Sequence, residues 1–250
     1  MQHSFSQKIL MKMKITNKIL IAALAAFSFA CEDPEYPTPV PSTATATTNV
    51  AGFNFWANNQ SLDFLYDNAA VGQTNLALGA NSGSTALYSS VKTGLHTIGF
   101  DSTGKRTATT TQATFLKGKY YSVFATDVSA PLIVTESFPA AVDGKAQVRF
   151  LQLSASADTA EVVDTATVAS VIFSSRAFRA ATTTITAFKA IDAGQVNWRI
   201  RQNTKKTTTK YSPIDVVETF SAGKNYTVVL RGSVTGSGSL GLGYTVIQHN

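Results

Sequence analysis

Two segments of this chain are each repeated about 100 residues later, and this repeat indicates the fold. Val91–Phe100 (VKTGLHTIGF) parallels Ile191–Ile200 (IDAGQVNWRI) at an offset of 100, and Thr114–Tyr121 (TFLKGKYY) parallels Thr219–Tyr226 (TFSAGKNY) at an offset of 105. Each copy reads as an apolar segment, a glycine turn, an alternating segment, and then Phe-x-x-Gly-Lys before another apolar segment. A repeat of about 100 residues is too long for a solenoid and is typical of tandem domains.

The pattern around the repeat predicts an all-β fold of two tandem immunoglobulin-like β-sandwiches. Short alternating segments bounded by turn residues, without helical periodicity, are the signature of such sandwiches. We place the first sandwich at residues 49–140 and the second at 145–250, with the joint near Ser137–Ala146. A chain of 250 residues that is 44% hydrophobic and 14% charged is not dominated by disorder. Its single cysteine excludes a disulfide framework and a cysteine-rich zinc site.

Residues 1–30 have the pattern of a secretory signal peptide. Lys12, Lys14 and Lys18 form a basic region directly before the apolar run 19–27, which is too short for an ordinary membrane span. The only cysteine, Cys31, follows at the expected cut. The segment thus resembles a bacterial lipoprotein signal, in which the cysteine is lipidated and becomes the first residue of the mature chain. It departs from that pattern at Ser28, where a leucine is usual, and at the bulky Phe29.

Residues 31–48 predict a disordered tether, because four of the seven prolines and a Ser/Thr/Ala stretch lie there. Glu32 and Asp33 resemble the tag that sends some Gram-negative lipoproteins to the outer face, and an acidic spacer is the alternative. We expect an exported protein whose membrane partner is held through the Cys31 lipid, in the outer membrane of a Gram-negative bacterium. The periplasmic and the external face both stay open. Without the four signal lysines, 17 basic and 15 acidic residues remain, which predicts no nucleic-acid partner.

Ala146–Ser154 (AQVRFLQLS) resembles the opening strand of a bacterial family, domain of unknown function 4397, typically V-R-F-x-N-A-S-P-D-A-P. The later Ala193-Gly194 turn and the strand Phe220–Val228 also resemble that family. The resemblance implies secreted or lipid-anchored immunoglobulin-like sandwiches, often in tandem, and it supplies no established active site. The S-P-D-A-P element itself is missing, and Ser154–Asp158 and Asn58–Gln60 stand in its place.

The residues that could carry catalysis are few, so we expect no enzyme, no cofactor and no metal site. After the signal, only His96 and His249 remain as histidines, and His96 aligns with Val196 on a core-facing side. We interpret His96 as a histidine at the edge of the core. With no mature thiol and no histidine near a nucleophile in sequence, the usual triads have no obvious base. A hydrolase that brings together two of the scattered carboxylates is the remaining enzyme hypothesis, with Glu136, Asp158, Glu161, Asp164 and Glu218 available.

A basic hairpin is the first candidate binding feature. Residues 193–214 contain no acidic residue. They carry five basic residues, which are Arg199, Arg201, Lys205, Lys206 and Lys210. Alternation places Arg199 and Arg201 on one face and Trp198 on the other. We interpret the Trp198 face as sandwich core. The basic face is either a solvated hairpin or a site for an anionic partner.

Trp56 is the second candidate, because in Phe53–Asn58 (FNFWAN) it shares a face with Asn54 and Asn58. Aromatic rings beside amides can stack on sugar rings, and packing against the neighbouring domain is the alternative. The sequence therefore predicts an envelope lipoprotein of two non-catalytic modules with a binding, adhesion or structural role. A glycan-capture lipoprotein is one alternative, and the carboxylate-based hydrolase is the other. Its partner beyond the membrane would be a surface glycan or an envelope protein.

Overall fold

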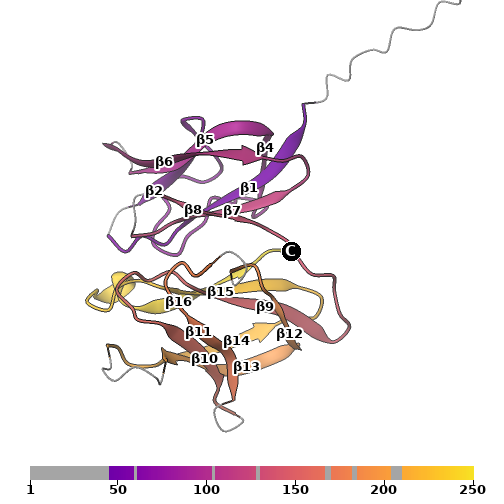
Figure 1. The fold of residues 1–250 in the computed structure, drawn as a ribbon, viewed down its shortest axis with the longest axis vertical. Helices are drawn as coiled ribbons and strands as arrows, with labels where there is room; N and C mark the ends of the chain where they lie inside the picture. The colour runs from indigo at the N-terminus through magenta and orange to yellow at the C-terminus, as the bar shows by residue number, and fades with distance from the viewer. Residues whose placement is uncertain are drawn as a thin grey trace, which may run out of the picture. The chain divides into compact units, whose positions relative to one another are not determined.

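The structure, a computed structural model, describes residues 45–58, 61–102, 105–127, 130–166, 170–181, 185–203 and 210–250, with side chains except at 105–109. The predicted signal peptide, Cys31 and residues 32–44 of the tether lie outside the described residues, as do Lys205 and Lys206. Thr45–Asn250 form one compact unit, in which strands assemble into four sheets (Figure 1). Within the described residues, no helix combines the length and apolar character needed to cross a membrane.

The first sandwich is built from two four-stranded sheets. One has the order β4 (Ser89–Lys92), β1 (Thr47–Asn54), β7 (Tyr120–Ala125), β8 (Leu132–Thr135). The other has the order β3 (Ala69–Ala70), β2 (Leu62–Tyr66), β5 (Gly94–Ser102), β6 (Lys105–Phe115). Strand β1 runs parallel to β7, and the other pairings are antiparallel.

The second sandwich repeats this arrangement strand for strand. One sheet has the order β12 (Lys189–Asp192), β9 (Lys145–Gln152), β15 (Asn225–Arg231), β16 (Gly243–Gln248). The other has the order β11 (Val171–Arg176), β10 (Ala160–Asp164), β13 (Gly194–Gln202), β14 (Ile214–Phe220), and a short 3-10 helix, η1 (Gly238–Leu240), precedes β16. Strand β9 again pairs in parallel with β15. The predicted all-β architecture of two sandwiches is confirmed.

The repeated glycine turns mark the points where the chain passes from one sheet of a sandwich to the other. Strand β4 ends at Lys92 in the first sheet, and β5 begins at Gly94 in the second. Gly94 has a φ of 124°, and Gly194, at the equivalent crossing from β12 to β13, has a φ of 129°. Residues with a Cβ avoid this region, so the crossing requires glycine.

Alternation along the strands produces a separate core in each sandwich. In the second, Trp198 is 4% exposed and its ring lies 5.4 Å from that of Phe220, which confirms that the Trp198 face is core. In the first, Ile98 and Phe100 of β5 pack with Phe115 of β6. The repeated sequence thus places equivalent strands over equivalent cores.

A third apolar cluster joins the two sandwiches. Its largest members are Phe53, Phe55 and Phe124 from the first sandwich, with Leu151 and Val229 from the second. Except for Phe55, which follows β1, these residues lie on β1, β7, β9 and β15, on the faces that point away from the core of their own sandwich. Strands β1 and β9 are consequently buried on nearly every residue and lose the simple alternation of a solvated strand.

The boundaries of the first sandwich differ slightly from the prediction. Strand β1 begins at Thr47, so Thr47 and Thr48 belong to the sheet and not to the tether. They pair with Lys92 and Val91 of β4, and the Thr48 hydroxyl donates a hydrogen bond to the carbonyl of Lys119. The composition of this stretch matches a tether, but β-branched threonine also fits an edge pairing, and the available partner strand decides between them.

Candidate functional site

The Trp56 region does not form the exposed platform that its sequence suggested. Asn54 is completely buried, its amide nitrogen donates to the carbonyl of Leu76 at 2.7 Å, and its amide oxygen accepts from the backbone N–H of Trp56. Trp56 is partly buried against the core of the first sandwich, and Asn58 is half-buried. Strand β1 ends at Asn54, so the alternation on which the prediction relied does not continue to Trp56. Asn54 is committed to the fold, which removes one amide from the glycan hypothesis.

The basic hairpin contains no acid in its own sequence, but in the structure its described cations lie beside acids from other segments. Arg199 pairs with Asp215 at 2.6 Å and Arg201 with Glu161 at 2.8 Å. Lys210 lies 3.8 Å from a carboxylate oxygen of Asp158. Glu161 lies on β10 and Asp215 on β14, the two strands that flank β13, and Asp158 lies just before β10. The three described cations of the hairpin are therefore compensated and do not form an open anion site.

His96 lies at the edge of the first core, as expected, and both of its ring nitrogens are occupied. Nδ1 is 2.5 Å from Asp67, Nε2 is 3.1 Å from the carbonyl of Thr93, and the ring lies 4.6 Å from that of Tyr66. The hydrogen bond with Asp67 raises the pKa of His96 and lowers the pKa of Asp67. A histidine that donates from both nitrogens cannot act as a base, and the sequence carried no local signal for the Asp67 partner.

The most unusual polar group of the molecule lies where the two sandwiches meet. Arg149 and Glu136 form an ion pair at 2.7 Å, and neither side chain has exposed surface. The Arg149 Nε also donates to the Thr227 hydroxyl at 2.7 Å, and the guanidinium carbon lies 4.7 Å from the ring centre of Phe188. A charge this deep requires a partner of opposite charge, because desolvation of an isolated ion costs several kcal/mol.

His249 and Tyr88 extend this group across the junction. The ring nitrogens of His249 lie 2.8 Å from the Tyr88 hydroxyl and 2.7 Å from the Thr227 hydroxyl. Burial, with a further contribution from Arg149, lowers the pKa of His249 to about 2, so the ring is neutral at physiological pH. Burial also raises the pKa of the Tyr88 phenol. We call Tyr88, Glu136, Arg149, Thr227 and His249 the junction cluster.

The junction cluster is suited to holding two domains together and not to chemistry. Tyr88 belongs to the first sandwich, Thr227 and His249 belong to the second, and Glu136 lies in the connection between them. The atoms Glu136 Oε2 and Arg149 Nη1 are buried without a hydrogen-bond partner among the described residues. The side chains of Glu136 and Arg149 have no exposed surface, so they cannot meet a substrate from solution. Sequence reasoning missed this cluster because its members are distant in the chain and lack a motif.

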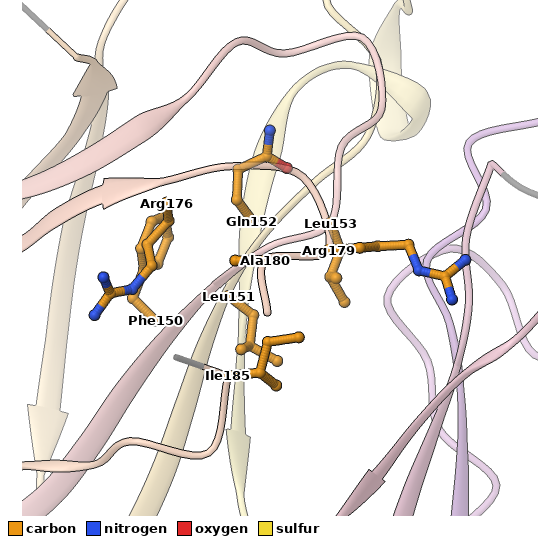
Figure 2. Close-up of a pocket in the computed structure, with 8 residues that line it drawn as sticks. All are labelled: Phe150, Leu151, Gln152, Leu153, Arg176, Arg179, Ala180 and Ile185. Atoms are coloured by element: carbon orange, nitrogen blue, oxygen red, sulfur yellow. The ribbon is translucent and has the colours of Figure 1, made fainter. Parts of the chain in front are cut away.

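A pocket beside β9 is a second place to consider, and Figure 2 shows its eight lining residues. Leu151 and Ile185 occupy it together, and it has essentially no free volume. The guanidinium groups of Arg176 and Arg179 point in opposite directions, so they do not converge on a common ligand (Figure 2). Arg179 instead donates to the carbonyl of Ala130 of the first sandwich at 2.8 Å. The pocket is part of the packing between the sandwiches.

No group of three or more His, Cys, Asp or Glu side chains that could hold a metal ion occurs among the described residues. Comparison with known families gives one match: residues 48–163 match the family model of DUF4397, a domain of unknown function. This confirms the resemblance for that part of the chain, which spans the first sandwich, the connection and strands β9 and β10. A search of curated proteins gives no match.

Proposed function

Taking the DUF4397 match as the premise, we propose that this chain is a lipid-anchored envelope protein whose two sandwiches form a non-catalytic binding, adhesion or structural module. The observation that carries the proposal is the junction between the sandwiches. An apolar cluster and a fully buried ion pair join them, which suits a rigid two-domain body better than two independently moving domains. A rigid body keeps the surfaces of its two sandwiches in a fixed arrangement relative to each other, and the tether lets it reach away from the membrane.

The non-catalytic part of the proposal rests on the condition of the polar side chains. His249 is neutral and buried, both nitrogens of His96 are occupied, and the carboxylates of Glu136 and Glu161 pair with arginines. A general base needs a free lone pair within reach of a substrate. A broad hydrolase screen should therefore give no turnover. Turnover that disappears on substituting one carboxylate would overturn this part.

The anchor of the proposal is Cys31, and its partner is the membrane. Each methylene group buried in a bilayer contributes about 0.8 kcal/mol, so several acyl chains on one residue hold a protein stably where a single chain does not. Intact-mass measurement on membrane-extracted protein should show an acylated Cys31 at the mature N-terminus. Cys31→Ala should leave the protein unacylated and absent from the washed membrane fraction. An N-terminus elsewhere, or an unmodified Cys31, would refute the anchor.

The outer-membrane location has its own test. Protease added to intact cells should cleave a surface-exposed protein, whereas a periplasmic one should be cleaved only after the cells are lysed in detergent. A protein that fractionates with the inner membrane would contradict the proposed location. The result shows which side of the outer membrane the protein faces. That side decides whether a surface glycan or another envelope protein is accessible to it as a partner.

A further inference from the structure

The end of the second sandwich contains an open groove with a volume of about 390 Å³. It lies where the β12–β13 crossing meets the end of β10. We call it the end groove, and its principal lining residues are Asp164, Ile172, Ile191, Asp192, Val196 and Trp198. Sites for small molecules generally have volumes of roughly 300–1,000 Å³, with an apolar lining and a few polar groups. The volume of the end groove lies in this range, and its lining combines the apolar side chains of Ile172, Ile191 and Val196 with polar groups that include Asp164.

The same end of the first sandwich is filled by its own side chains. Tyr66 pairs with Ile98 across β2 and β5, and Asp164 pairs with Trp198 across β10 and β13, so Tyr66 and Asp164 are equivalent positions. The Tyr66 ring lies 4.6 Å from the His96 ring, and its hydroxyl donates to the carbonyl of Lys92 at 2.5 Å. Two rings thus close the end of the first sandwich.

The second sandwich has smaller side chains at both of these positions. Asp164 replaces the tyrosine, and Val196 replaces His96 in the repeat alignment. The replacements remove two rings, the phenol of Tyr66 and the imidazole of His96, and they leave a carboxylate beside apolar residues. A carboxylate accepts hydrogen bonds and cannot donate one, so a ligand that binds to Asp164 must itself supply the donor.

The charges around the end groove favour a cation as that donor. Asp192 is already paired with Lys145 at 2.6 Å, and Lys189 donates to the carbonyl of Ile172 at 3.3 Å. Asp164 accepts from the backbone N–H of Ala166, and no lysine or arginine among the described residues forms an ion pair with it. In the first sandwich, the imidazole ring of His96 pairs with the carboxylate of Asp67. The second sandwich has Val196 at the position of His96, so it has no such ring to pair with a carboxylate.

We propose that the end groove binds a small organic ammonium ion carried on a ring, of the arylalkylamine class. The ring contacts Ile172, Ile191 and Val196, and the ammonium group donates to the carboxylate of Asp164. This inference deepens the proposed binding role and rests on it, whereas it does not depend on the lipid anchor.

The test uses the full chain and three probes of similar shape: 2-phenylethylamine, the neutral 2-phenylethanol and the anionic 3-phenylpropanoate. Titration is followed by calorimetry and by tryptophan fluorescence, since Trp198 lines the groove. The amine should bind saturably, and the other two should bind at least about tenfold more weakly, because hydrogen bonds between charged groups are the stronger ones. Equal binding of the amine and the alcohol, or no binding of the amine, would overturn the proposal.

Variants locate the binding. Asp164→Asn keeps the shape and removes the charge, so it should weaken amine binding about tenfold. Val196→Phe should block the groove and abolish binding. Asp215→Asn is the matched control, because Asp215 is an exposed acid of the same sandwich that pairs with Arg199 away from the groove, and binding should not change. If circular dichroism shows that one groove variant fails to fold, the other decides. Amine binding that survives in a folded groove variant would refute the site, while membrane attachment through Cys31 would stand unaffected.

Discussion

Acidification from pH 7.5 to 5 should destabilise the protein through His249 by about 2 kcal/mol. The residue His249 is 7% exposed, and burial lowers the pKa of its ring from 6.5 to about 2. In this range the unfolded chain therefore gains a proton at His249 that the folded protein does not accept. Stability is present above the unfolded pKa and is lost as the pH falls, by about 1.4 kcal/mol per pH unit once the pH is well below 6.5.

His96 acts in the opposite direction, so the measurement is made in a His96→Gln background. The pKa of His96 is raised by Asp67, and its stabilisation is present below the unfolded pKa and lost as the pH rises through the folded value. Asp127, whose pKa is raised by burial, acts in the direction opposite to His249. The background variant leaves His249 as the main titrating group above pH 5.

The assay is urea unfolding at pH 7.5, 6.5, 5.8 and 5, with the free energy of unfolding extrapolated at each pH. The His96→Gln protein should lose about 2 kcal/mol over this range. The double variant His96→Gln/His249→Gln should lose much less, because glutamine retains a donor and an acceptor but does not titrate. A flat profile in the single variant, or the same slope in both proteins, would refute the assignment of a neutral buried His249.

Other predictions follow from single contacts. Arg149→Met should lower the free energy of unfolding by about 3–5 kcal/mol, because Glu136 is left buried without its partner. The double variant Arg149→Met/Glu136→Leu should recover most of that loss, and a larger loss in the double variant would contradict this. Gly194→Ala should cost about 1–3 kcal/mol because of its φ of 129°, with thermal unfolding as the readout and an unchanged midpoint as the contrary result. Arg199→Ala should leave the urea midpoint nearly unchanged, because its pair with Asp215 is exposed to solvent, and a clear loss of stability would contradict this.

Much of each sandwich could be predicted from local pattern. The faces of β13 followed alternation, so Trp198 and Ile200 were correctly placed in the core. The prediction failed at Asn54, because β1 is covered on both faces and its last residues leave the strand pattern. At Arg199 and Arg201 the sequence left a solvated hairpin and a site for an anionic partner open, and it gave no sign of the acidic partners on neighbouring strands. In both places the missing information was a contact with a segment that is distant in the chain.

The all-β class, the duplication and the glycine turns at Gly94 and Gly194 could be predicted from the sequence alone. These depend on a period of two residues and on backbone torsions, which are local properties that each copy of the repeat records. Only the tertiary structure decided that His249 is a buried neutral ring and that the end of one sandwich is filled while the other is open. Tyr88 and His249 are 161 residues apart in the chain, and their contact exists only because the sandwiches pack together. Burial and pairing set the properties of a polar side chain, and both are settled by neighbours that the local sequence does not name.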